Sequence, residues 1–277
     1  MSAQPDDRAA EPITFSPRRV GAMVLRYWYL LRSSWPRVLD LIYWPAVQML
    51  MWGFLQLYVN QNSSFFTQSA GVFIGAVLLW DILFRGQLGF SISFLEEMYA
   101  RNLGNIMMSP LRPVEFVTAL MVMSIIRLAI GMVPVTFLAI AFFGFNLWSL
   151  GLALAAFFLN LILTSWAIGI FVAGLLLRNG LGAESLAWTF MFLFLPLTCV
   201  YYPVSVLPVW LQYVAWVLPP TYVFEGMRAL LIEHVFRADL MIQAFAINVV
   251  FFAAASVSFF MLLASARRNG TLLQTGE

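Results

Sequence analysis

Long apolar runs constrain the fold of this chain more than any other feature of its sequence. Six of them lie near residues 38–59, 70–90, 114–143, 147–177, 185–202 and 241–264. A helix needs about 20 residues to cross the hydrocarbon core of a bilayer, where every backbone polar group has to be satisfied within the protein. We therefore predict an all-α integral membrane protein with six transmembrane helices. The third and fourth runs are longer than necessary and are expected to tilt or protrude.

The composition supports the same class of protein. Hydrophobic residues make up 62% of the chain and charged residues 10%, whereas soluble domains carry roughly 25% charged residues. All fifteen basic residues are arginines, and a Walker phosphate-binding loop needs a lysine. The chain is therefore not expected to hydrolyse ATP alone. Its arginines are scattered and form no basic stripe, so no nucleic-acid partner is expected.

Cofactor and metal chemistry find little support in the sequence. Cys199 and His234 are the single cysteine and the single histidine, which leaves no internal disulfide and no metal site built from a Cys/His cluster. A membrane-embedded transferase would need a cluster of bases, nucleophiles or metal ligands, and none is visible. We expect no catalytic residue, no metal and no cofactor on this chain.

The positions of the arginines predict the topology. Six arginines precede residue 38, and others follow the second, fourth and sixth runs, while residues 60–69 and 144–146 carry no charge. Short loops rich in arginine stay on the cytoplasmic side. Both termini are therefore predicted to be cytosolic, with no cleaved signal peptide. Residues 1–17 are expected to form a disordered cytosolic tail, and residues 18–277 a single transmembrane domain.

The segment Arg18–Arg37 mixes arginines with large apolar and aromatic residues. This mixture is typical of an amphipathic helix that lies in the membrane interface. The alternative is a simple basic flank of the first span. Both interpretations place the segment on the cytosolic face.

A charged segment, Leu95–Glu115, separates the second and third spans. Glu96, Glu97, Arg101 and Asn102 are expected to share one short cytosolic helix. A glycine and two prolines then interrupt the chain before the next span. We interpret this segment as a docking element for a soluble partner.

The segment Pro203–Asp239 is apolar but carries four prolines, so it is not expected to cross the membrane as one helix. Two short helices, Val209–Val217 and Thr221–Phe236, are expected to form a re-entrant hairpin before the sixth span. Glu225 and Arg228 are spaced to pair on its second helix.

Charged residues also lie inside the predicted spans. Asp81 and Arg85 are one helical turn apart and are expected to pair, with Arg127 of the third span as a further contributor. Charges within a membrane are rare and often functional. The pair is therefore interpreted either as a structural clamp between helices or as part of a substrate route.

The order of these features resembles the permease subunits of type-2 ATP-binding-cassette (ABC-2 type) exporters. The resemblance extends over nearly the whole chain. Two groups of residues carry the resemblance. The first follows the second span and consists of Glu96, Glu97, Asn102, Leu103, Ser109, Pro110, Leu111 and Glu115. The second lies around the predicted hairpin and consists of Pro203, Leu207, Pro208, Trp210, Leu211, Pro219, Tyr222, Glu225 and Arg228.

The resemblance implies a transport subunit that works with a separate ABC ATPase, which would hold ATP and magnesium. Two permeases, identical or paralogous, would form the path across a bacterial inner membrane. A coupling helix, about Glu96–Ile106, would contact the ATPase, with Arg18–Arg37 as the lateral contact and cytosolic gate. Tyr222, Glu225 and Arg228 would lie in the outer hairpin.

The cargo is left open between two classes. The spans hold few amides or hydroxyls besides Gln48, Gln87, Asn160 and Thr164, which favours an amphipathic or hydrophobic cargo such as a drug, lipid or glycolipid. The alternative is a polysaccharide or glycolipid exporter, for which the ten tryptophans could provide stacking. A rival from another class is an ion-coupled secondary transporter that uses the charges inside the spans, although no inverted repeat is visible.

Overall fold

The computed structural model describes residues 15–62 and 71–269, in which the secondary structure consists of helices and turns with no β-strand. The predicted tail lies almost wholly outside them, as do residues 63–70 and 270–277. The helices are α1 (Pro17–Arg32), α2 (Trp35–Asn62), α3 (Val72–Tyr99), α4 (Leu103–Met108), α5 (Pro113–Phe143), α6 (Leu152–Asn179), α7 (Ser185–Leu197), α8 (Val209–Val217), α9 (Pro219–Arg228) and α10 (Ala238–Asn269). The all-helical prediction is confirmed.

Within the described part of the chain, five helices, α2, α3, α5, α6 and α10, are long and apolar enough to cross a membrane. The predicted fifth span, 185–202, corresponds to α7, which begins where expected but has only 13 residues. Six full spans therefore stay a prediction. The second span was placed at 70–90, whereas α3 continues nine residues farther, to Tyr99. The fourth run begins with a 3-10 turn, Leu147–Leu150, before α6 starts at Leu152.

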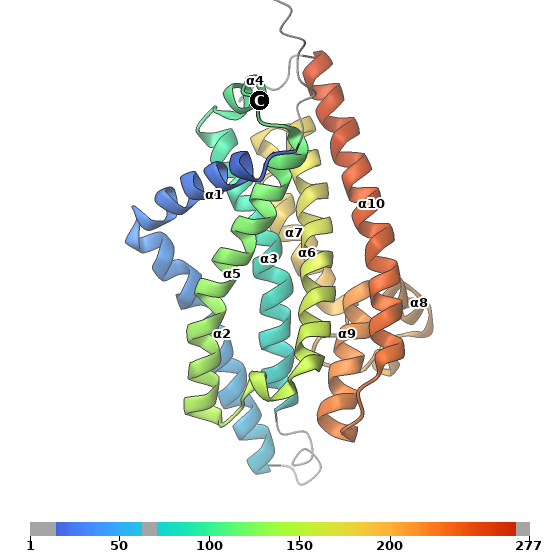
Figure 1. The fold of residues 1–277 in the computed structure, drawn as a ribbon. Coiled ribbons are helices and arrows are strands. Elements are labelled where there is room, and N and C mark those ends of the chain that lie inside the picture. Colours follow the sequence, from blue (N-terminus) through green and yellow to red (C-terminus); the bar gives the residue numbers. More distant parts are fainter. Residues whose placement is uncertain (1–14, 63–70, 270–277) are drawn as a thin grey trace, which may run out of the picture.

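The centre of the bundle is α3, which packs against α5, α6 and α2 (Figure 1). Most of its residues are buried, and Phe90 and Phe94 are among the largest fully buried side chains. A Cβ atom at Gly89 would lie 3.1 Å from the Cα of Ser124, so a glycine lets α3 approach α5 closely. Helices α2 and α10 flank this core and expose much of their apolar surface.

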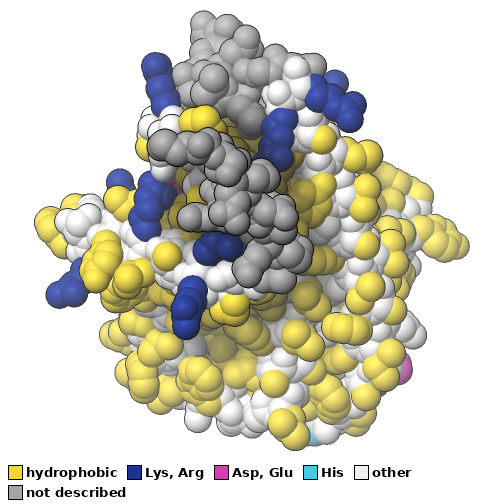
Figure 2. Space-filling view, turned by 45° about the horizontal axis from the view of Figure 1, so that its top comes forward, with side chains coloured by type: hydrophobic (Ala, Val, Ile, Leu, Met, Phe, Trp, Pro, Cys, Tyr) yellow, Lys and Arg dark blue, Asp and Glu magenta, His cyan; other side chains and the backbone are white. Residues whose placement is uncertain are grey.

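The helix α1 packs against α5 at the end of the bundle that also holds α4 and the last turns of α10 (Figure 1). It ends at Arg32, five residues before the predicted limit, and α2 starts after a two-residue break. Tyr27 and Leu31 of α1 are buried, while Leu25 and Tyr29 are exposed. The basic side chains gather over this end, on an otherwise apolar surface (Figure 2). We call it the arginine-rich end.

Candidate coupling site and polar groove

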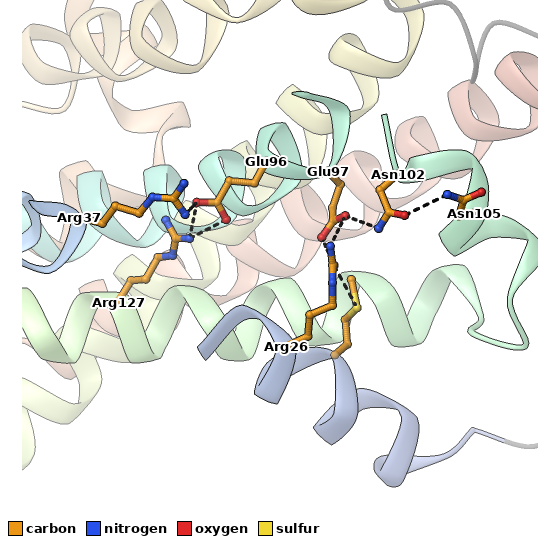
Figure 3. Close-up of polar contacts among 8 residues, drawn as sticks. Arg26, Arg37, Glu96, Glu97, Asn102, Asn105 and Arg127 are labelled. Atoms are coloured by element: carbon orange, nitrogen blue, oxygen red, sulfur yellow. Dashed lines mark hydrogen bonds and ion pairs between the residues drawn. The ribbon is translucent and has the colours of Figure 1, made fainter. Parts of the chain in front are cut away.

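The last turns of α3 carry two adjacent glutamates that bind different neighbours. Both oxygens of Glu96 accept hydrogen bonds from Nη2 of Arg127 on α5, each at 3.0 Å. Arg37 of α2 lies 3.5 Å from the same carboxylate (Figure 3). Glu96 therefore joins α3 to α5 and α2. Arg127 was expected near the Asp81–Arg85 pair, but its ionic partner is Glu96.

Glu97 points to the other side of α3 and is 1% exposed. It accepts hydrogen bonds from two nitrogens of Arg26 on α1, and from Nδ2 of Asn102 at 2.9 Å (Figure 3). The hydrogen bond to Glu97 raises the pKa of the Arg26 guanidinium above its ordinary value. Glu97 thus ties α1 to the residue that precedes α4.

The prediction that Glu96, Glu97, Arg101 and Asn102 share one short helix is wrong. The two glutamates belong to α3, Arg101 lies in the connecting turn, and Asn102 is the N-cap residue of α4. Arg101 has φ of 53°, a left-handed conformation that allows the sharp turn between the two helices. The short helix of this segment is α4 alone.

The exposed surface of α4 is separate from the glutamates. Leu103 and Ile106 are buried against the bundle, whereas Asn105 is exposed and Met108 is 80% exposed. Asn105 also donates a hydrogen bond to Asn102 at 3.2 Å. Helix α4 therefore has an inner face held by the core and an outer face at the arginine-rich end.

Arg85, of the charged pair inside α3, lines a groove. Arg85 Nε lies 3.6 Å from Asp81 Oδ1, so the predicted i,i+4 ion pair is present. The groove has a volume of about 700 Å³ and lies among α2, α3, α5 and α7. Its charged lining residues are Asp40, Arg85 and Arg127, and aromatic side chains form much of the rest.

Comparison with protein families gives a match over most of the chain. The model of the ABC-2 type transporter family covers residues 23–232, from the middle of α1 to the end of the hairpin. The chain belongs to the ABC-2 type transporter family. It is thus a transport permease of the membrane, as its resemblance implies. A comparison with curated proteins finds no match to the chain.

In this ABC-2 type protein, a third glutamate anchors the start of α1 to the start of α5. Glu115 accepts hydrogen bonds from the backbone amide of Ser16 at 2.7 Å and from Arg19 Nε at 2.9 Å. It also accepts from the amide of Arg112 at 2.9 Å, which caps α5. In the sequence, Glu115 stands out only through the family resemblance, and Arg19 only as part of the basic segment Arg18–Arg37. Their separation of 96 residues hides the contact from local sequence patterns.

The segment predicted as a hairpin contains α8, α9 and a π-helical turn, Ala229–Glu233. The predicted second helix, Thr221–Phe236, is wrong in its limits, because α9 begins at Pro219 and ends at Arg228. The expected pair is present, with Arg228 Nη2 at 2.9 Å from Glu225 Oε1. Arg228 also donates to the carbonyls of Cys199 and Val200, at 2.9 and 3.3 Å. Tyr222 donates to the carbonyl of Trp216 at 2.8 Å. These contacts give the three predicted hairpin residues structural partners.

Some polar residues of the spans lie away from the groove. Asn160 and Thr164 of α6 form a buried cluster with Asn248 of α10, in which Thr164 donates to Asn248 Oδ1 at 2.6 Å. Sequence reasoning overlooked Asn248 because a lone amide in an apolar run gives no pairing signal. The cluster joins two helices. Among residues 15–62 and 71–269, no group of three potential metal-ligating side chains occurs.

Proposed function

We propose that this ABC-2 type permease is the membrane subunit of an ATP-driven exporter and couples to a separate ATPase through α4. The observation that carries the proposal is the pair Glu96 and Glu97 at the end of α3. One carboxylate binds α5 and α2, and the other binds α1 and the start of α4. A displacement of α4 would therefore move α1 and α3 together.

The outer face of α4 supplies the docking surface in this proposal. Met108 offers an apolar contact, and Arg101 and Asn105 offer polar ones. Because Glu96 and Glu97 are held by arginines of the same chain, they transmit movement and do not touch the ATPase. An ATPase can shift the permease only by binding its two conformations with different affinity. The short connection from α4 through Asn102 to Glu97 is suited to that role.

The proposed topology places both termini and α4 on the cytosolic side of a bacterial inner membrane. The basic side chains at the arginine-rich end support this orientation (Figure 2). The hairpin of α8 and α9 would then approach the outer side. A second permease, identical or paralogous, would complete the path, and the exposed apolar side chains of α2 support a further membrane or protein contact.

The proposed cargo is amphipathic or hydrophobic, because the groove beside α3 is mainly apolar and aromatic. A drug, a lipid or a glycolipid fits this description. Polysaccharide or glycolipid export is the second candidate, favoured by the tryptophans that line the groove. Ion-coupled secondary transport is less well supported, since Arg127 is bound to Glu96 and not to the Asp81–Arg85 pair.

Co-expression with a candidate ATPase that carries a phosphate-binding loop tests the proposal. Wild-type permease should retain the ATPase during purification. Met108→Asp should reduce retention at least tenfold by placing a charge on the apolar docking surface. Glu97→Gln should retain the ATPase but lose cargo-stimulated ATP turnover. Asp239→Asn, on exposed α10, is the matched control and should change neither quantity.

Two outcomes would contradict this proposal. One is wild-type protein that binds no ATPase yet moves cargo on an ion gradient. The other is a Met108→Asp variant that keeps full retention of the ATPase, which would place the docking surface away from α4.

A further inference from the structure

The groove among α2, α3, α5 and α7 has one continuous aromatic wall. Trp80 stacks on Phe84 with ring centroids 6.0 Å apart, and Phe84 contacts the rings of Trp188 and Phe192 at 5.9 and 6.3 Å. Trp44 of α2 also lines the groove. The volume of about 700 Å³ falls within the range of sites that hold drug-sized ligands, about 300–1,000 Å³.

Arg85 gives this wall a cationic end. Its side chain is 11% exposed, and its Nε atom makes no hydrogen bond to any described residue. Asp81, 3.6 Å away, is too far for a hydrogen bond and is itself without a hydrogen-bond partner among the described residues. A buried guanidinium without acceptors is unfavourable. A carboxylate or phosphate entering the groove would supply acceptors in the geometry that guanidinium prefers.

Of the charged residues that line the groove, the two arginines are largely buried and Asp40 is exposed. Arg127 also lines the groove, and although Glu96 neutralises it, its Nε has no hydrogen-bond partner among the described residues. Asp40 lines the groove from an exposed position on α2. Asp81 is fully buried and does not line the groove. A cationic head that passed Asp40 would therefore meet Arg85 and Arg127.

We propose that the groove binds an amphiphile with an oxyanion head, a carboxylate or a phosphate. The head lies at Arg85 and the apolar body lies along Trp80, Phe84, Trp188 and Phe192. This inference rests on the proposed function for its role in transport, because it names the chemical class of the cargo. The binding itself needs no ATPase. The head group can come from a membrane phospholipid or from an amphipathic acid in solution.

Tryptophan fluorescence of the purified full-length chain tests the binding, because three tryptophans line the groove. The probes are 9,10-dibromostearate, which quenches tryptophan, and its methyl ester, which has the same apolar body without the charge. Wild type should bind the acid at least fivefold more tightly than the ester. In Asp81→Asn/Arg85→Gln, which removes both charges and leaves neutral polar side chains, the preference should fall below twofold with ester binding unchanged. An equal preference in both proteins would overturn the proposal.

A competition assay on the wild type needs no variant to fold. Dodecyl phosphate should displace bound dibromostearate, and dodecyltrimethylammonium at the same concentration should not. The reverse order of displacement would overturn the proposal. Because no ATPase is present in these assays, their failure would leave the coupling role of α4 to its own test.

Nanodiscs distinguish the two sources of the oxyanion. Quenching by dibrominated phosphatidylglycerol that the double variant loses would identify the ligand as a membrane lipid. Quenching by added dibromostearate alone, with the same dependence on Arg85, would identify a soluble amphipathic acid. Both results support an oxyanion site, and quenching by neither probe would overturn it.

Discussion

Replacing Glu97 with alanine tests whether this carboxylate holds the end of α3 to α1. The side chain is 1% exposed and accepts hydrogen bonds from Arg26 and Asn102. Breaking a fully buried ion pair costs roughly 3–5 kcal/mol. Arg26 is 39% exposed and can turn to solvent, which lowers the cost. We expect Glu97→Ala to reduce the free energy of unfolding by about 2 kcal/mol.

The glutamine variant separates charge from shape. Glu97→Gln keeps the volume and one acceptor oxygen, so we expect a loss of about 1 kcal/mol, the difference between a charged and a neutral hydrogen bond. A double-mutant cycle with Arg26→Gln should give a coupling energy of about 1 kcal/mol, because the two side chains interact directly.

Unfolding of the purified chain in mixed micelles with increasing SDS measures these energies. The control is Asp239→Asn, which breaks the exposed pair with Arg237 and should leave the unfolding midpoint unchanged. A Glu97→Ala loss no larger than that of the control would refute the reasoning, as would strictly additive effects of the two glutamine substitutions.

Three further predictions concern packing and the hairpin. Asn248→Leu should lower the free energy of unfolding by about 1 kcal/mol, measured in the same SDS titration, because it removes hydrogen bonds between α10 and α6. Gly131→Ala should destabilise the chain, since its Cβ would lie 2.6 Å from the carbonyl oxygen of Leu41, whereas Gly21→Ala, with open space around it, should raise the unfolding midpoint. Arg228→Leu should speed hydrogen exchange in the segment before α8, and unchanged exchange would show that its carbonyl contacts do not hold that segment.

The limits of α8 could be predicted because their signals are local. Prolines delimit α8, whose observed limits are the predicted Val209–Val217. The same holds for the ion pair of Glu225 and Arg228, since residues three apart share a helical face. The second helix of this segment was predicted to be longer than it is: α9 ends at Arg228, and a π-helical turn follows it. Local sequence patterns thus predicted the limits of α8 and the ion pair of Glu225 and Arg228, but not where α9 ends.

The end of α3 could not be predicted from the sequence because its charges are neutralised at long range. Glu96 and Glu97 mark the end of an apolar run in the sequence, yet the helix continues past them to Tyr99. Their arginine partners on α5 and α1 lie 31 and 71 residues away. When those partners are not known, two adjacent glutamates indicate the start of a solvent-exposed segment.

The groove could not be predicted from local sequence patterns either. Its aromatic residues come from α2, α3 and α7. In the sequence they are separate tryptophans and phenylalanines in apolar runs, where membrane anchors or packing residues are the ordinary interpretation. Only the arrangement of three helices shows that they form one wall, with Arg85 at its end.

The shortness of α7 has a consequence for the surrounding lipid. Its 13 residues rise about 20 Å, whereas the hydrocarbon core is about 30 Å thick. Residues 198–203, directly after α7, are not helical, and Arg228 donates hydrogen bonds to the carbonyls of Cys199 and Val200. With those carbonyls satisfied, α7 can end inside the membrane. The adjacent leaflet would then thin to meet it, which would give a lipid-borne molecule a shorter distance to travel beside this helix.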